Sequence, residues 1–137
     1  MNASIFYSRL NININSLAIF FWNDFYLIIT IFDIVLKGKK SSVEVVSRSV
    51  AKGESRQKFL SNIKGKNECF GHVECDGILL GQAKIESVPA IIAENVEASL
   101  VHEASIGKIA GEQLVKLQTL GLSEEESQNE IIKGFLK

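Results

Sequence analysis

Polar and apolar side chains alternate along residues 96–103, a pattern typical of a β-strand with one buried face. Ala98, Leu100 and His102 fall on one face of this strand, whereas Glu103 falls on the other. We therefore expect an imidazole ring on an otherwise apolar face, next to a carboxylate that points the opposite way.

The spacing of the apolar residues then changes to that of a helix. Leu114 and Leu117 recur at helical spacing and Leu120 widens their stripe, so the pattern predicts an amphipathic helix over residues 111–120. Gly121 follows the last turn, where glycine adopts the left-handed conformation at the lowest cost. The helix is therefore expected to end there.

A second helix is predicted directly after this glycine. Ser123 and Glu126 have the spacing of a capping box, and the acidic run of residues 124–126 suits the positive end of a helix dipole. This helix carries three apolar residues inward: Ile131, Ile132 and Phe135. Two helices this short are not stable alone in water, so they must pack on the strands or on a partner. An ordinary hairpin that closes a core is the simpler alternative.

Short β runs separated by turn residues fill the middle of the chain. Four glycines mark turns, and Pro89, the only proline, marks a turn or a strand end. The expected runs are residues 34–36, 43–50, 58–63, 69–80, 83–88 and 90–93. This spacing fits a sandwich, a barrel or a solenoid of strands, and no clear internal repeat distinguishes them.

Candidate chemistry lies on two of these strands. Within residues 71–77 the side chains alternate, so Cys75 falls on an apolar face and His72 on the polar one. Cys75, His102 and Glu103 carry thiolate, imidazole and carboxylate groups, which bind iron or zinc. The alternative interpretation is that Cys75 is a small buried hydrophobe and His102 a hydrogen-bonded core histidine. Both His102 and Glu103 can be ligands only if the strand ends or twists between them.

The first third of the chain contains a long apolar segment. Residues 17–36 are nearly continuously apolar and lysines follow them, so by length this segment could span a bilayer. Asn23, Asp24 and Asp33 argue against a span, and the β-branched and aromatic content suits strands equally well. A small membrane-anchored, β-rich protein without a metal is therefore an alternative to the interpretation developed below.

Size and composition indicate one modest domain. The chain has 137 residues, is 46% hydrophobic, and carries a net charge of −1 without a basic stripe, which argues against nucleic-acid binding. Its two cysteines, Cys69 and Cys75, are too few for a secreted disulfide framework. Reduced thiols in the cytoplasm are expected.

Several segments resemble the C-terminal part of the SufB/SufD family, the scaffold subunits of the Suf iron-sulfur cluster assembly system. The order and spacing of these segments cover about the last hundred residues, more than a chance motif would give. They are Glu44-Val45-Val46-Ser47-Arg48, Gly71-His72-Val73-Glu74-Cys75-Asp76, Pro89, His102-Glu103-Ala104, Ile106-Gly107-Lys108-Ile109, Glu112-Gln113-Leu114, Gly121-Leu122-Ser123-Glu124-Glu125-Glu126 and Gly134-Phe135-Leu136.

The resemblance implies a mainly β fold with C-terminal α structure: a partial right-handed parallel β-helix followed by a short helical hairpin. It also implies a scaffold and not an enzyme. The hairpin would bind the ABC-type ATPase SufC, and a second SufB/SufD subunit would complete the interface where a transient iron-sulfur cluster forms. Cys75, His102 and Glu103 match residues implicated in that site, whereas Val101 stands where SufB proteins can carry a further glutamate.

The resemblance divides the chain into three parts. Residues 1–32 form an apolar extension without a detected resemblance, residues 33–105 a partial β-helix, and residues 106–137 a helical segment. Family members run to several hundred residues, so we expect the chain to be truncated, and an inactive gene remnant is a further alternative. A β-helix cut within its stack exposes an open edge, which the segment of residues 17–36 could cap.

Overall fold

The structure is a computed structural model that describes residues 10–22 and 25–137, with side chains from Leu27 onward. Seven strands are followed by two helices. The strands are β1 (Leu10–Trp22), β2 (Phe25–Leu36), β3 (Ser41–Ala51), β4 (Arg56–Gly65), β5 (Cys69–Leu79), β6 (Lys84–Ala93) and β7 (Ala98–Lys108), and the helices are α1 (Gly111–Thr119) and α2 (Glu124–Phe135).

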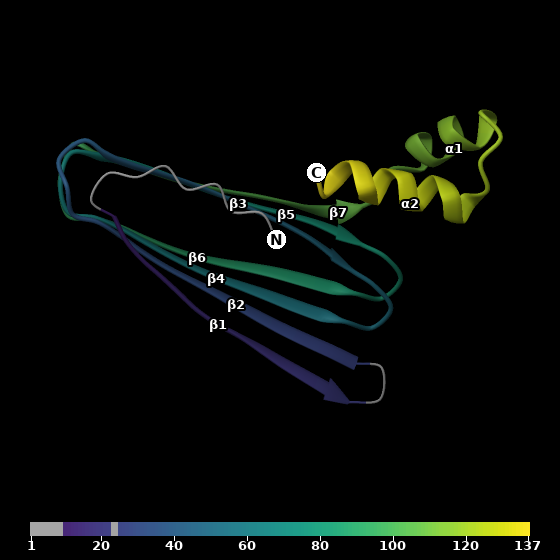
Figure 1. Ribbon diagram of the computed structural model, residues 1–137, viewed down its shortest axis with the longest axis horizontal. Helices are drawn as coiled ribbons and strands as arrows, with labels where there is room; N and C mark the ends of the chain where they lie inside the picture. Colours follow the sequence, from purple (N-terminus) through teal and green to yellow (C-terminus); the bar gives the residue numbers. More distant parts are fainter. Residues whose placement is uncertain (1–9, 23–24) are drawn as a thin grey trace.

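From β2 onward, consecutive strands alternate between two sheets that face each other (Figure 1). Strands β2, β4 and β6 pair in parallel in one sheet, and β3, β5 and β7 pair in parallel in the other. Leu27 pairs with Arg56 and Arg56 with Lys84, so the same position of the coil returns after 29 and then 28 residues. The expected partial parallel β-helix is confirmed.

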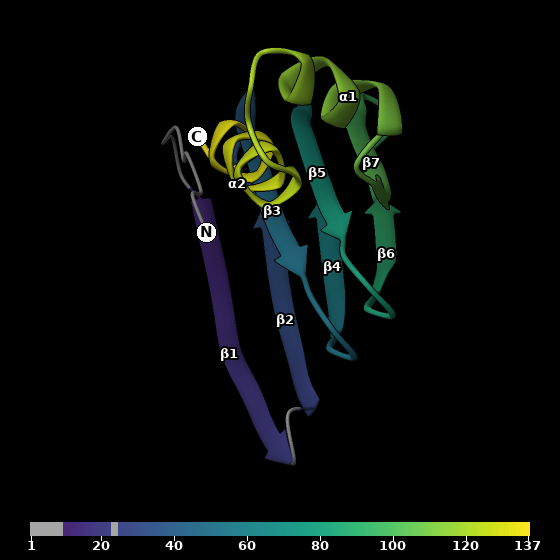
Figure 2. The same ribbon diagram turned by 90° about the vertical axis from the view of Figure 1, so that its right-hand side faces the viewer.

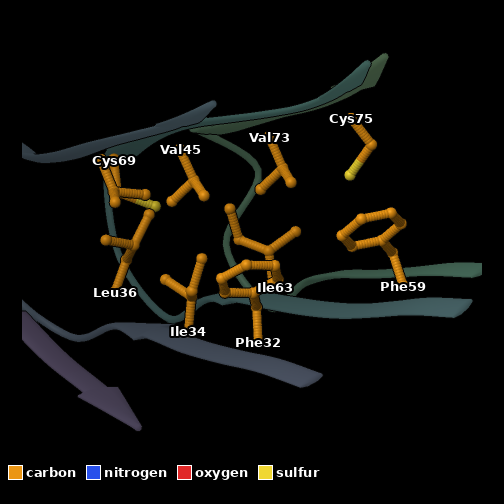
Figure 3. Packing of buried hydrophobic residues seen from close by; sticks show 10 residues of the cluster. Phe32, Ile34, Leu36, Val45, Phe59, Ile63, Cys69, Val73 and Cys75 are labelled. Atoms are coloured by element: carbon orange, nitrogen blue, oxygen red, sulfur yellow. The ribbon is translucent and has the colours of Figure 1, made fainter. Parts of the chain in front are cut away.

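Alternation of side chains builds the core between the sheets. Every second residue of β3 and β5 points inward, as the period of two requires. The inward side chains of both sheets interdigitate (Figure 3), and burying one such aliphatic or aromatic side chain contributes roughly 1.5–3 kcal/mol. The core contains Phe32, Ile34, Leu36, Val43, Val45, Phe59, Ile63, Cys69, Val73 and Cys75.

The corners of the coil stack as well as its strands. The backbone N–H of Lys66 donates to the carbonyl of Leu36 at 2.9 Å, and the N–H of Glu94 donates to the carbonyl of Gly65 at 2.8 Å. Each turn thus hydrogen-bonds the turn one rung away, so neighbouring rungs are held in the same register at this corner.

The N-terminal apolar segment forms strands. β1 pairs antiparallel with β2 and therefore covers the edge of that sheet. The expected boundary at Asp33 falls inside β2, which continues the parallel pairing with β4 over its whole length from Leu27. Asn23 and Asp24, which argued against a membrane span, lie outside the described residues, as do residues 1–9. Neither helix in the described part of the chain has the length and apolar character needed to cross a bilayer.

The prediction that Pro89 separates two strands is wrong. A single strand, β6, runs through it from Lys84 to Ala93, and Pro89 pairs with Ser61 of β4. β6 is an edge strand among the described strands. An edge strand tolerates a proline at a position where the backbone N–H would point away from the sheet, because no ladder hydrogen bond is lost there.

Both helices begin and end close to their predicted positions. α1 ends before Gly121, whose φ of +96° is the left-handed conformation that favours glycine. At the start of α2, the Ser123 N–H donates to the Glu126 carboxylate at 2.8 Å and the Glu126 N–H donates to the Ser123 hydroxyl at 3.3 Å. The capping box predicted from the sequence is therefore present in full.

Removing this cap should loosen the first turn of α2. We expect Ser123→Ala to cost about 1 kcal/mol of local helix stability because it leaves the Glu126 N–H without its acceptor. Amide hydrogen exchange at Glu126 and Ser127 should then be about fivefold faster at neutral pH. Unchanged exchange in this turn would contradict a stabilising role for the cap.

The effect should depend on pH in one direction. Hydrogen bonds from the Ser123 backbone and side chain hold the pKa of Glu126 below its ordinary value of 4.5. The bonds to the Glu126 carboxylate are therefore fully present above 4.5 and are lost as the pH falls through the lower pKa of the folded chain. The difference in exchange between wild type and Ser123→Ala should shrink in acid but not vanish, because the bond from the Glu126 N–H to the Ser123 hydroxyl does not titrate.

Candidate functional site

Cys75 lies inside the β-helix. It sits on β5, is only 1% exposed, and faces Phe59 across the core (Figure 3). Burial raises the pKa of its thiol, a hydrogen bond with the side chain of Ser87 offsets part of this rise, and the nearby charges of Asp76 and Glu74 raise the pKa further. The thiol is therefore protonated at neutral pH while nothing positively charged is bound beside it.

His102 points into the same interior from β7. It pairs with Val73, two residues before Cys75 on the neighbouring strand, and its side chain is half-buried. Its Nε2 lies 3.4 Å from the hydroxyl of Ser87. Burial lowers the pKa of His102, and the charge of His72 on the other side of the sheet lowers it further, so the ring is neutral at neutral pH.

Ser87 joins the two predicted site residues. It lies on β6 in the facing sheet, its hydroxyl is 3.4 Å from Nε2 of His102, and it is the neighbour that lowers the pKa of Cys75. The pattern of the sequence alone did not point to Ser87. The alternation of Ile85 and Ser87 does place the Ser87 hydroxyl on the inner face of an expected strand. Its neighbours on other strands could not be predicted, because they depend on how the rungs stack.

Glu103 does not join this group. It lies on the outer face of β7, where its Oε2 is 3.5 Å from Nε2 of His72, and Glu44 approaches Nδ1 of the same ring at 3.8 Å. The strand does not end or twist between His102 and Glu103, because β7 continues to Lys108. The two predicted ligands therefore point to opposite faces, as strict alternation requires.

Further charged groups continue along this outer face. Asp76 lies 3.8 Å from the Arg48 guanidinium. The pKa of Glu74 is raised mainly by a hydrogen bond with the Asp76 side chain, with burial and the charge of Asp76 adding to the rise. The predicted polar face of β5, which carries His72, Glu74 and Asp76, is confirmed as the outer face of the sheet.

The described residues alone do not form a complete metal site. No three histidine, cysteine, aspartate or glutamate side chains converge as a metal centre within residues 10–22 and 25–137. Both cysteines are free thiols. Cys75 and His102 provide two potential donors on the inner side of the coil, and Glu103 provides a third on the outer side of the strand that carries His102.

The last rung of the coil has open edges. β6 and β7 each end their sheet in the described part of the chain, and they lie in the two facing sheets at the same edge of the coil (Figure 2). Large apolar side chains are exposed along them: Val88, Ile91 and Ile92 on β6 and Val101 on β7. Unpaired strand edges with exposed apolar residues are typical of surfaces that pair with another chain.

The helical hairpin carries a second exposed apolar surface. α1 and α2 pack against each other beyond the end of β7 (Figure 1), yet α1 has no buried residue and α2 buries only Ser127. Leu114 and Leu117, the two residues of the predicted stripe, are half-buried. Val115 is 58% exposed and Leu120 is 73% exposed, so neither side chain packs closely on the described part of this chain.

Comparison with known proteins identifies the family of this chain. Residues 2–135 match the family described as SUF system FeS cluster assembly, SufBD core domain, and this range includes most of the extension for which the sequence analysis found no resemblance. An iron-sulfur cluster assembly SufBD family protein of Methanothermobacter thermautotrophicus strain Delta H is 39% identical over 105 residues, which are 75% of this chain and 26% of that protein.

Two further relatives support the same assignment. A SufBD family protein of Pyrococcus horikoshii is 39% identical over 74% of this chain and 31% of its own length. A SufBD family protein of Staphylococcus aureus strain USA300 is 30% identical over 74% of this chain and 23% of its own length. The chain thus spans about a quarter to a third of the length of these curated relatives. On the match to nearly its whole length, the chain belongs to the SufBD family of iron-sulfur cluster assembly proteins.

Proposed function

We propose that this chain is a scaffold component of iron-sulfur cluster assembly, in which the nascent cluster is cargo and not a resident cofactor. The observation that carries the proposal is that Cys75 and His102 both point into the interior from neighbouring strands of a SufBD-type β-helix. A thiolate and an imidazole are suitable iron ligands, and the apolar residues around them limit access of water.

The remaining ligands come from a second SufB- or SufD-like subunit. Its β-helix pairs with the open edges of β6 and β7, which covers the exposed side chains of Val88, Ile91 and Ile92. His102 and Glu103 lie on opposite faces of β7, so a partner that wraps this edge strand can meet both. The transient cluster then forms at the subunit interface with Cys75, His102 and Glu103 as the donors from this chain.

The hairpin binds a SufC-like ABC ATPase. The exposed side chains of Val115 and Leu120 provide apolar contacts, and the acidic first turn of α2 adds charge to the hairpin surface. ATP hydrolysis belongs to that partner, so the chain itself is not an enzyme. We place the complex in the cytoplasm, where free thiols such as those of Cys69 and Cys75 stay reduced.

Loss of the Cys75 thiol tests the cargo role. We expect Cys75→Ala to lower the iron and acid-labile sulfide retained after anaerobic reconstitution with the partner subunits, because the inner side of the coil loses its thiolate donor. Cys69→Ala is the matched control, since Cys69 is also a buried, inward cysteine of β5 but has no contact with Ser87 or His102 among the described hydrogen bonds.

The two variants should therefore differ. Full retention with Cys69→Ala and reduced retention with Cys75→Ala supports the proposal. Equal retention by wild type and Cys75→Ala would remove Cys75 from the cluster site.

A further inference from the structure

Ser87 occupies a special place in the last rung. It is half-buried on the edge strand β6, and its side chain points inward beside Phe59, its partner on β4. Phe59 in turn faces Cys75 across the core (Figure 3).

The Ser87 hydroxyl can hold the His102 ring. A hydroxyl donates one hydrogen bond and accepts others, and a neutral imidazole donates at one nitrogen and accepts at the other. The Ser87 oxygen lies 3.4 Å from Nε2 of His102, so the two groups can hydrogen-bond in either tautomer of the ring.

Other inward serines do not share this role. Ser47, Ser49 and Ser61 are also directed into the coil, and their buried hydroxyl oxygens have no hydrogen-bond partner among the described residues. Ser61 lies on β4 in the same sheet as Ser87 and is 1% exposed. It is therefore a matched control for an interior hydroxyl that holds nothing in place.

We propose that Ser87 is a positioning residue, whose hydroxyl orients the His102 ring inside the last rung before the cargo iron arrives. This inference rests on the proposed scaffold function. Groups that orient metal ligands in this way typically change metal affinity by a factor of ten or more when they are removed.

The first test measures the orientation without any metal. The chain has two histidines, His72 and His102, so their ring nitrogen signals can be assigned by NMR with a His72→Gln variant. We expect Ser87→Ala to shift the His102 ring nitrogens and leave those of His72 unchanged. Ser87→Thr, which keeps the hydroxyl, should restore the wild-type signals, and Ser61→Ala should not move them. Unchanged His102 signals in Ser87→Ala would overturn the inference.

The second test measures the consequence for binding, with ferrous iron alone as the probe and the chain in complex with its partner subunits under anaerobic conditions. We expect Ser87→Ala to bind iron about tenfold more weakly and Ser87→Thr to bind like wild type. Equal affinity of Ser87→Ala and wild type would overturn the positioning role even if the ring signals shift. A wild-type complex that binds no iron would overturn the proposed function itself, and the ring signals would still decide whether the hydrogen bond exists.

Discussion

Replacing Val115 and Leu120 with aspartate should abolish capture of this chain by a SufC-like ATPase. Both side chains are exposed on the hairpin, at 58% and 73%, so the substitutions place charge on its surface without opening the contact between α1 and α2. A carboxylate that is buried without a partner in an apolar contact costs several kcal/mol. We therefore expect the dissociation constant, measured by titration with the ATPase, to rise by about a hundredfold or more.

The control introduces the same charge elsewhere on the same helix. Gln113 and Gln118 are exposed on α1, and replacing both with aspartate leaves the exposed apolar side chains intact. This variant should bind within a few-fold of wild type. Retained binding after the substitutions at Val115 and Leu120, or equal loss in both variants, would contradict docking through this apolar surface.

A valine at Gly71 should strongly destabilise the β-helix. A Cβ added there would lie 2.3 Å from Cδ1 of Ile63, 3.0 Å from Cδ2 of Leu100 and 3.3 Å from Cδ1 of Leu36. Ile63 and Leu36 are core residues, so neither side chain can move without displacing others. Overpacking a core typically costs about 1–3 kcal/mol, and because valine adds three carbons where one does not fit, we expect the free energy of unfolding to fall by about 3 kcal/mol.

Gly107 provides the matched position for this experiment. It lies on β7 in the same sheet, and a Cβ added there meets no atom within 4 Å. Gly107→Val should therefore leave the free energy of unfolding nearly unchanged in denaturant titrations. If both valine variants unfold at the same denaturant concentration as wild type, the close packing of the two sheets at Gly71 is contradicted.

Local patterns were sufficient to predict the faces of the strands and the limits of the helices. The alternation around Cys75 predicts which side chains are buried, because the period of two is a property of the extended backbone itself. The capping box at Ser123 and the left-handed glycine at Gly121 are likewise determined by a few neighbouring residues. These features do not depend on contacts with distant parts of the chain.

Contacts between rungs could not be predicted in this way. The site residues Cys75, Ser87 and His102 belong to three strands in two sheets, and they meet only because the chain returns to the same position after one coil. The continuity of β6 through Pro89 also depends on its place at an edge, which is a property of the sheet and not of the local sequence. Alternation did predict that His102 and Glu103 point apart, but it could not identify Ser87 as the inward partner of His102.

The proposed function requires Cys75 and His102 to act together as one cluster-forming site. The most direct test measures iron and acid-labile sulfide per chain after anaerobic reconstitution with the partner subunits, for wild type, Cys75→Ala, His102→Ala and the double variant. Residues that act as a unit give strongly non-additive losses. We predict that the double variant retains about as much iron and sulfide as the single variant that retains less. Independent losses that multiply in the double variant, or full retention by either single variant, would contradict a shared site.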